Sequence, residues 1–308
     1  MKTSASKLQV NTISLGDCLS LLPHISSSSV QLIVADPPYF NVLEEAWDQQ
    51  WLQAREYLDW SGRWIDECIR ILKPDGLFYV FGQLGKREHV FLHLMSETCQ
   101  RHQFHDQIIW DRVVGYNERR DSFTPACEMI LVLRKTATPK FYKEAVREPY
   151  DEETIQAYLK DPRYKDKERR LAHLRKGKFA TNLWRVPSLK GSSNEKCGHP
   201  SQKPEKLIER IILSSSSPGD LVLDPFMGSG TTACMAQKHR REWLGIELDP
   251  TYIAMAEKRL ALNLQAEVES SLKQNRKVSG RAKIPTTGQL QFFTPPEQKP
   301  ASLPGLPS

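Results

Sequence analysis

Residues 221–232 read Leu-Val-Leu-Asp-Pro-Phe-Met-Gly-Ser-Gly-Thr-Thr, and this stretch decides the fold. Its first three residues are apolar, as in a buried parallel strand, and a helical pattern begins at Thr231. Between them, Gly228 and Gly230 allow the backbone to approach a ligand closely, because they carry no side chain. The free amide groups at the start of the helix suit a phosphate or a carboxylate. The stretch therefore predicts a strand, a ligand-binding turn and a helix of an α/β fold.

The glycine turn differs from the two common phosphate-binding turns. A Walker-type loop has a lysine after its last glycine, where Thr231 stands, and the dinucleotide fingerprint needs a third glycine, which does not follow. The next apolar run ends at Glu247, 17 residues after Gly230. An acid at the tip of a strand can accept hydrogen bonds from ribose hydroxyls. A glycine turn with a ribose acid but no phosphate lysine indicates an adenosine linked to an amino acid, S-adenosyl-L-methionine.

A second turn, Asp36-Pro37-Pro38-Tyr39, directly follows the apolar run 30–35. Ligands of open α/β sheets bind at the carboxyl ends of strands, so we expect this turn to face the same crevice as the glycine turn. The two prolines stiffen the turn and remove two amide donors. The Asp36 carboxylate and the carbonyl groups around Pro37 are left as hydrogen-bond acceptors.

Two acceptors of this kind suit the methylation of an exocyclic amine. The lone pair of such an amine is delocalised into the ring, and acceptors on its two hydrogens would localise the pair and direct it at a methyl donor. Tyr39 would stack on a base that has been flipped out of the duplex, because a base inside the duplex is out of reach. The alternative is structural, with Asp36 as a helix cap and Tyr39 in packing. The residues assigned to catalysis are Asp36, Pro37, Pro38 and Tyr39.

These blocks resemble the amino-methyltransferases of DNA, specifically the permuted class in which Asp-Pro-Pro-Tyr precedes Asp-Pro-Phe-x-Gly-Ser-Gly. The resemblance covers most of residues 11–264 and includes Gly16-Asp17 and residues 199–204, His-Pro-Ser-Gln-Lys-Pro. It implies a Rossmann-like α/β fold with a mixed, mostly parallel sheet of seven strands, one antiparallel hairpin and helices on both faces.

The resemblance also implies roles in cofactor binding. Asp17 matches an acid that helps to hold the adenine of the cofactor, Glu247 faces the ribose and Lys203 helps to hold the methionine end. A helix N-cap is as good an interpretation of Asp17 from the sequence alone, and a solvated side chain is the alternative for Lys203. The residues expected to line the S-adenosyl-L-methionine site are Asp17, Lys203, Asp224, Phe226, Gly228, Ser229, Gly230, Thr231, Thr232 and Glu247.

The net charge of +6 is unevenly distributed. Residues 134–180 hold 14 Lys and Arg against 8 Asp and Glu, and residues 270–308 hold 6 against 1. Such asymmetry suggests a polyanion partner, although a solvated charged face is the commoner explanation. In the class that the chain resembles, the protein segment between the two halves reads the DNA sequence. In this chain that segment is 134–195. The candidate DNA contacts are Arg147, Lys160, Arg163, Lys165, Arg169, Arg170, Arg175 and Lys178.

Periodicity and composition define the expected organisation. Strands are expected at 30–35, 77–81, 108–110, 128–133, 221–223 and 243–248, and helices at 18–25, 55–72, 204–213, 231–239 and 250–264. The chain then divides into a catalytic half at 1–133, an inserted basic target-recognition region at 134–195, a cofactor-binding half at 196–266 and a disordered basic tail at 267–308.

The favoured substrate is the N6 amino group of adenine in double-stranded DNA. In the family that the chain resembles, Asp before Pro-Pro-Tyr is typical of adenine enzymes, whereas Ser is commoner in N4-cytosine enzymes. N4 of cytosine is the alternative. RNA or protein-amide methylation is less favoured, because such enzymes commonly carry Asn in front of Pro-Pro-Tyr and place the turn after the glycine block. A cognate restriction endonuclease is a candidate partner, and both a monomer and a homodimer remain open.

Other classes of protein are disfavoured by simple features. No apolar run approaches the ~18 residues of a membrane span, and residues 1–7 lack the apolar stretch of a signal peptide, so we expect a cytoplasmic protein without a membrane partner. None of the six cysteines has the two-residue spacing of a zinc or redox motif. We therefore expect neither a metal site nor a disulfide framework.

Overall fold

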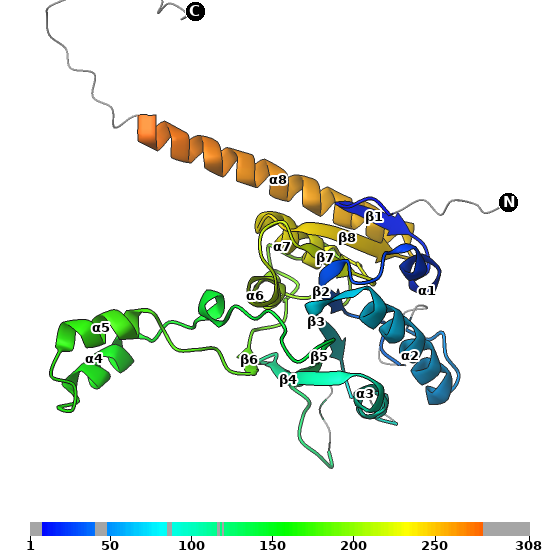
Figure 1. Ribbon diagram of the computed structural model, residues 1–308, viewed down its shortest axis with the longest axis horizontal. Coiled ribbons are helices and arrows are strands. Elements are labelled where there is room, and N and C mark those ends of the chain that lie inside the picture. Colours follow the sequence, from blue (N-terminus) through cyan, green and yellow to red (C-terminus); the bar gives the residue numbers. More distant parts are fainter. Residues whose placement is uncertain (1–7, 41–47, 85–87, 116–117, 119, 280–308) are drawn as a thin grey trace, which may run out of the picture. The chain divides into compact units, whose positions relative to one another are not determined.

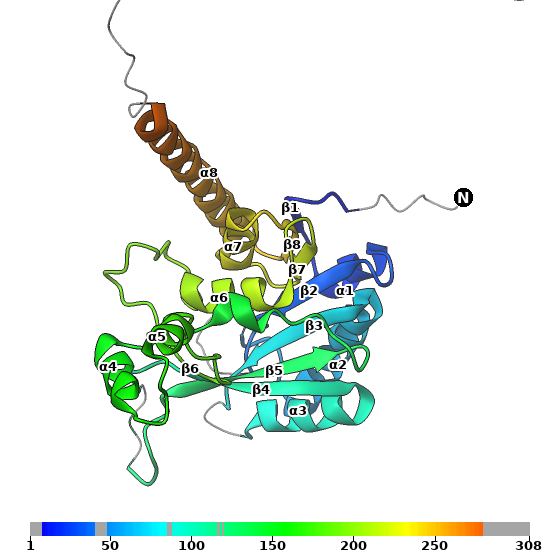
Figure 2. The same ribbon diagram turned by 60° about the vertical axis from the view of Figure 1, so that its left-hand side comes forward.

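The computed structural model describes residues 8–40, 48–84, 88–115, 118 and 120–279, with side chains to residue 265. The chain divides at residue 266 into two units, Met1–Ala266 and Glu267–Ser308. In the described part of the first unit, eight strands form one sheet in the order β1-β8-β7-β2-β3-β5-β4-β6 (Figures 1 and 2). Their bounds are β1 Thr12–Leu15, β2 Val30–Ala35, β3 Leu72–Gly82, β4 Gln103–Asp111, β5 Cys127–Arg134, β6 Leu183–Arg185, β7 Leu221–Asp224 and β8 Glu242–Glu247.

Helices follow the strands along the chain. They are α1 Cys18–Leu21, α2 Ala54–Ile71, α3 Val90–Arg101, α4 Glu152–Lys160, α5 Lys167–Arg175, α6 Glu205–Ser215, α7 Thr231–Lys238 and α8 Pro250–Ser279, with short 3-10 turns at Leu22–His24 and Lys143–Val146. Among the described helices, none is both long and apolar enough to cross a membrane.

The sheet is mixed and mostly parallel, as predicted. Strand β5 is antiparallel to both of its neighbours, β3 and β4, and the other paired strands of the described chain run parallel. The sheet has eight strands instead of the expected seven, because the segment 134–195 contributes β6. That strand pairs with the end of β4, where Trp184 lies opposite Trp110. Part of the expected insertion is therefore an edge of the sheet.

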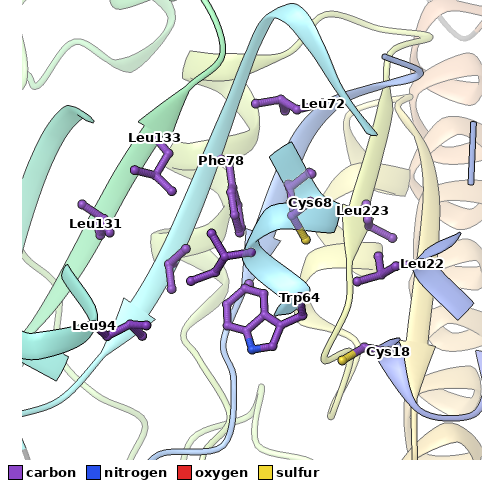
Figure 3. Close-up of a cluster of buried hydrophobic side chains, with 14 of the residues drawn as sticks. Cys18, Leu22, Trp64, Cys68, Leu72, Phe78, Leu94, Leu131, Leu133 and Leu223 are labelled. Carbon is purple, nitrogen blue, oxygen red and sulfur yellow. The ribbon is translucent and has the colours of Figure 1, made fainter. Parts of the chain in front are cut away.

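Strand β2 lies between β7 and β3, and all six of its residues are buried. Its side chains alternate between two hydrophobic clusters, with Ile33 in one and Leu32 in the other. Figure 3 shows the first cluster, where Trp64 and Cys68 of α2 pack near Phe78 of β3. The second cluster contains residues of α6, α7 and α8. Apolar side chains on both faces of the strand explain why the sequence shows a continuous apolar run instead of an alternating one.

Several element boundaries differ from the prediction. The expected helix 18–25 is short α1 followed by a 3-10 turn, and β1 and α3 were not expected. Helix α8 continues to Ser279, so the stretch 267–279, expected to be disordered, is helical. Residues 280–308 of the expected tail lie outside the described residues. The missed helix α3 has only a short apolar stripe, which contains Phe91 and Leu94.

The end of β3 makes a testable close contact with α3. A Cβ atom on Gly82 would collide with the ring of Phe91, whereas a Cβ atom on Gly191 would meet nothing within 4 Å. We expect Gly82→Ala to lower the free energy of unfolding by about 1–3 kcal/mol, because over-packing forces neighbouring side chains to shift. Gly191→Ala is the matched control and should stay within about 0.5 kcal/mol of the wild type. Urea denaturation measures both, and equal stability of the two variants would contradict the packing assignment.

Candidate active site

The two predicted turns meet at one edge of the sheet. Strands β2, β7 and β8 are neighbours and run parallel, so the residues that follow them lie together. A cavity of about 800 Å³ lies at this edge. Of the predicted site residues, those that line it are Asp17, Asp36, Pro37, Pro38, Tyr39, Lys203, Asp224, Phe226, Gly228, Ser229, Thr231, Thr232 and Glu247. Gly230 is the one predicted cofactor residue that does not line the cavity.

The glycine turn requires left-handed backbone at both glycines, with φ of +49° at Gly228 and +76° at Gly230. The two positions serve different contacts. A Cβ atom on Gly228 would lie 3.0 Å from Nε2 of His199, which also lines the cavity. A Cβ atom on Gly230 would lie 2.8 Å from Cβ of Ala256 in α8. Gly230 therefore allows close packing of the turn on α8, whereas Gly228 keeps the cavity side open.

Glu247 closes the glycine turn from the neighbouring strand. Its Oε2 accepts a hydrogen bond of 2.7 Å from the Gly228 amide, and its Oε1 accepts from the amides of Leu248 and Asp249 at 2.8 and 2.9 Å. A carboxylate offers about four acceptor positions, so roughly one is left for a ligand hydroxyl. Burial raises the pKa of Glu247, while these three backbone donors act in the opposite direction.

Asp224 ends β7 beside the same cavity. Its side chain is 5% exposed and its Oδ1 accepts a hydrogen bond of 3.0 Å from the Phe226 amide. Burial raises the pKa of Asp224 to about 7, against an ordinary value of 3.8. The residue can therefore hold a proton at neutral pH, unlike an exposed aspartate.

A buried ion pair occupies the catalytic turn. The Lys203 ammonium donates to both carboxylate oxygens of Asp36, at 2.8 and 2.7 Å, and its Nζ lies 3.6 Å from Oε2 of Glu128. Lys203 is 7% exposed. Burial alone would lower the pKa of Lys203, but the two carboxylates outweigh this effect and the pKa is raised. The ion pair joins Lys203 to the Asp-Pro-Pro-Tyr turn, and because Lys203 also lines the cavity, its expected role at the methionine end of the cofactor stays a prediction.

The Tyr39 hydroxyl belongs to the same network. It donates to Oδ1 of Asp36 at 2.7 Å and lies 3.2 Å from Oε2 of Glu128. Burial, followed by the charges of these two acids, raises the pKa of Tyr39 well above its ordinary value, so the phenol stays a neutral donor. The backbone of the turn is also anchored, since the Tyr57 hydroxyl donates to the Pro38 carbonyl at 3.0 Å.

Comparison with known proteins identifies the family. The model of a family described as a DNA methylase matches residues 30–258, which contain both turns, Lys203 and Glu247. The chain belongs to the DNA methylase family.

Two relatives span most of this DNA methylase. The Type II methyltransferase M.BglII of Bacillus subtilis is 34% identical over 264 residues, which are 82% of this chain and 70% of that protein. The DNA adenine methyltransferase YhdJ of Escherichia coli (strain K12) is 31% identical over 282 residues, which are 88% of this chain and 90% of that protein.

Two solved structures share the fold. The PvuII DNA methyltransferase (cytosine-N4-specific) has a TM-score of 0.61 at 22% identity and covers 83% of this chain and 88% of its own. A putative DNA modification methylase of Thermus thermophilus, complexed with S-adenosyl-L-methionine, has a TM-score of 0.53 at 26% identity, with coverages of 82% and 95%. The predicted Rossmann-like fold, DNA methyltransferase activity and dependence on S-adenosyl-L-methionine are thereby confirmed.

The cavity of this DNA methylase fits its cofactor. A volume of about 800 Å³ lies within the usual range of ligand pockets. Aromatic rings form one wall, where Phe226 packs against Trp60 at 5.7 Å and Trp64 at 5.0 Å between ring centroids. The acceptor left on Glu247 suits a hydroxyl group. Burial lowers the pKa of His199 to about 4, so this residue adds no positive charge to the cavity.

Asp17 is a helix N-cap, one of the two roles that the sequence suggests for it. Its Oδ1 accepts from the Leu19 and Ser20 amides at 3.0 and 3.3 Å, which makes it the N-cap of α1. It also lines the cavity, so a role at the cofactor stays a prediction.

The sequence analysis missed several residues that line the cavity, and three of them carry polar groups at strand ends of the β3-β5-β4 part of the sheet. Glu128 begins the apolar part of β5, Arg112 follows β4, and Gln83 follows β3. The sequence signal available for Glu128 was an acid at the very start of a strongly apolar strand. Because β5 is antiparallel to β3, its beginning lies at the edge where β3 ends.

The basic candidates of the segment 134–195 fall into two groups. Three of them form ion pairs within the protein: Arg147 with Glu144, Arg163 with Asp161, and Lys178 with Glu148. Arg170 lies over the ring of Tyr164, 3.9 Å from its centroid. The side chains of the second group are exposed and have no ion-pair partner among the described residues: Lys160, Lys165, Arg169 and Arg175.

The raised pKa of Asp224 predicts a pH effect on stability. The folded state holds this proton more tightly than the unfolded state, so the contribution of Asp224 is full below its ordinary value and is lost as the pH rises through about 7. We expect Asp224→Asn, which keeps the acceptor for the Phe226 amide, to remove that loss. The free energy of unfolding, measured by urea denaturation of both proteins between about pH 4 and pH 8, tests this. Parallel curves for the two proteins would contradict it.

Proposed function

We propose that this DNA methylase methylates the N6 amino group of adenine within a specific short sequence of double-stranded DNA. The observation that supports this most directly is the Asp36 carboxylate on the cavity wall, held between Lys203 and Tyr39. It follows β2, the neighbour of the strand that leads into the glycine turn. The group that binds an amine and the turn that binds the cofactor therefore face one cavity.

Hydrogen-bond acceptors activate the amine in this proposal. Asp36 accepts one N–H of the amine, and the carbonyl groups around Pro37 are candidates for the other. This arrangement aims the nitrogen lone pair and stabilises the positive charge that the nitrogen gains. The described part of the chain holds no cluster of metal ligands, and the acceptors of the Asp-Pro-Pro-Tyr turn carry the orientation of the amine.

The cofactor-facing residues have separate tasks. S-adenosyl-L-methionine supplies an electrophilic methyl group when it is bound. We assign ribose binding to Glu247, a position on the aromatic wall to Phe226 and close backbone approach to Gly228. Asp224 sits behind the turn, where it holds the Phe226 amide. Lys203 acts on Asp36 in this proposal instead of on the methionine end.

The target base must leave the duplex to reach the cavity. Tyr39 would stack on it, and its anchored hydroxyl keeps the ring in a constant orientation. The cost of unstacking is offset by contacts that the flipped base gains in the cavity.

Adenine is preferred to cytosine for two reasons. Asp36 stands where adenine enzymes of the family typically have Asp, and the Escherichia coli relative at 31% identity is named an adenine methyltransferase. N4 of cytosine is the second candidate, because it presents the same amine chemistry. The PvuII enzyme at 22% identity shows only that the fold is shared.

We also infer the biological setting. The Asp-Pro-Pro-Tyr turn precedes the glycine turn in the chain, so we assign the protein to the permuted class. The Bacillus subtilis relative is named a Type II methyltransferase, which supports a cognate restriction endonuclease as partner. A DNA substrate supports action in the cytoplasm.

The segment 134–195 is proposed as the DNA-docking and target-reading region. Four of its eight candidate basic side chains are exposed and have no ion-pair partner among the described residues, and they lie on or between α4 and α5: Lys160, Lys165, Arg169 and Arg175. Exposed Lys and Arg bind phosphates and can also read guanine edges. The loop between β4 and β5 offers Phe123, 95% exposed, as a further candidate for contact with bases.

The substrate assignment is tested by mass spectrometry of nucleosides. We expect DNA from a host that expresses the protein to gain N6-methyladenine, and Asp36→Asn to lower the rate by at least about a hundred-fold. Binding of S-adenosyl-L-methionine, measured by calorimetry, should change less than about two-fold, because Asp36 is assigned to the amine.

Two outcomes would contradict this assignment. A rise of N4-methylcytosine without N6-methyladenine would replace adenine by cytosine, and wild-type turnover of Asp36→Asn would remove Asp36 from catalysis. Asp59→Asn serves as the control, since Asp59 is an exposed acid of α2 that pairs with Arg55.

The docking proposal predicts a salt effect. Replacement of the four exposed basic residues by Gln should weaken DNA binding and lower the slope of log affinity against log salt by up to about 4, roughly one per lost phosphate contact. Fluorescence anisotropy at several salt concentrations measures this slope. The four residues are Lys160, Lys165, Arg169 and Arg175.

Removal of two exposed positive charges elsewhere in the protein provides the control. Replacement of the exposed Arg55 and Lys238, which lie on α2 and α7, should leave the slope unchanged. If both sets of variants lower the slope equally, the segment 134–195 has no special part in docking.

A further inference from the structure

Glu128 is a buried acid that lines the cavity beside Asp36 and Lys203. It is 7% exposed, and each of its carboxylate oxygens has two polar neighbours. Oε2 lies 3.2 Å from the Tyr39 hydroxyl and 3.6 Å from the Lys203 ammonium. Oε1 lies 3.4 Å from both Arg112 and Gln83. Burying an acid is unfavourable unless it is paired, so this position is built around its charge.

We propose that Glu128 is a positioning residue for methyl transfer, which shares Lys203 with Asp36 and thereby keeps an acceptor on Asp36 open for the substrate amine. The inference rests on the proposed function of Asp36. It adds a role for Glu128, an acid on another strand, which would control how strongly Lys203 binds Asp36.

The hydrogen bonds of Asp36 show why such sharing matters. Its carboxylate has about four acceptor positions. Lys203 takes one on each oxygen and the Tyr39 hydroxyl takes a second on Oδ1. Counting the donors from the described residues, an acceptor position for the substrate N–H is left only on Oδ2. The N–H would share this oxygen with the ammonium, which lies 2.7 Å away.

Glu128 gives the ammonium a second place to bind. A shift of Nζ by under about 1 Å from its present 3.6 Å separation would bring it within hydrogen-bond distance of Glu128. Lys203 would then lean toward Glu128 when the amine binds Asp36, and its charge would remain paired. Without Glu128, Asp36 would be the one acid paired with the ammonium among the described residues, and the ammonium would compete directly with the amine.

The surroundings of Glu128 fit a positioning role. Arg112 is 8% exposed and lies 3.4 Å from Oε1 of Glu128. It therefore compensates the negative charge of Glu128 and leaves Oε2 for Lys203. The net charge of the cluster is zero, because two acids, Asp36 and Glu128, face two bases, Lys203 and Arg112. Gln83 supplies a neutral donor, which orients the carboxylate without changing this balance.

The test compares Glu128→Gln with Glu128→Asp in steady-state methylation of a DNA that carries the target site. For Glu128→Gln we expect kcat to fall about ten- to a hundred-fold, while KM for DNA and for S-adenosyl-L-methionine stays within about two-fold. Glu128→Asp keeps the charge and should give an intermediate kcat. The alkaline limb of the pH profile of Glu128→Gln should move to lower pH, because removal of a carboxylate lowers the pKa of Lys203.

Controls separate positioning from stability and from the proposed function. Glu209→Gln alters an acid of α6 that does not line the cavity and that pairs with Lys238 and His239, and it should leave kcat unchanged. Asp36→Asn should be inactive in the same assay. If the wild type methylates no DNA amine, the proposed function fails. If the wild type is active and Asp36→Asn is not, a wild-type kcat and pH profile for Glu128→Gln overturns only the inference.

Thermal melting shows whether Glu128→Gln folds. If it does not fold, Glu128→Asp provides the test. Glu128→Asp withdraws the carboxylate from Lys203 by one methylene while it keeps the charge. A several-fold loss of kcat at unchanged KM supports the shared lysine. A wild-type kcat in this variant contradicts it.

Discussion

The ion pair between Lys203 and Asp36 is the interaction on which the rest of the site depends. It joins groups 167 residues apart, one from the segment before α6 and one from the turn after β2. An ammonium that is 7% exposed is stable only with compensating charge, and Asp36 and Glu128 both supply it. The pair therefore joins the segment before α6 to the turn after β2 and holds Asp36 at the cavity. In the proposed function the substrate amine binds an acceptor that Lys203 already engages, so the rate of methyl transfer would depend on the strength of this pair.

The sheet explains how distant residues reach that pair. Strands β2, β7 and β8 run parallel, so their carboxyl ends and the turns that follow them share an edge. Strand β5 runs in the opposite direction and brings its first residues to the same edge. An acid at the end of a parallel strand and an acid at the start of an antiparallel one can thus face a single lysine. A wholly parallel sheet would have placed Glu128 at the opposite edge.

Short sequence motifs predicted which residues lie at the cavity better than they predicted the contacts between residues that are remote in sequence. Three features have a local cause that a local pattern reveals. The apolar run of β2 is buried on both faces, the glycine turn needs left-handed backbone, and Glu247 is the acid at the tip of β8. The partner of Lys203 has no local cause, because Asp36 is remote in sequence and meets it only through the fold. Gly230 was expected at the cofactor, yet its close neighbour is Ala256 of α8, a contact that only the packing of that helix reveals. Strand β6 has three residues and forms because β4 offers it an edge, so periodicity could not find it.

The structure also shows that only part of the positive charge in residues 134–180 is available to a ligand. The sequence counts 14 basic residues there, but the structure uses some of them to hold the segment itself together. Arg147 donates to the Gly177 carbonyl at 2.7 Å and lies over the ring of Phe179, and Arg163 pairs with Asp161 at 2.6 Å. An arginine that is already bonded to backbone and carboxylate must break those bonds before it can bind a phosphate. The charge available to a polyanion is therefore the exposed and unpaired part, which is concentrated on and between α4 and α5, and the net charge of the segment overstates it.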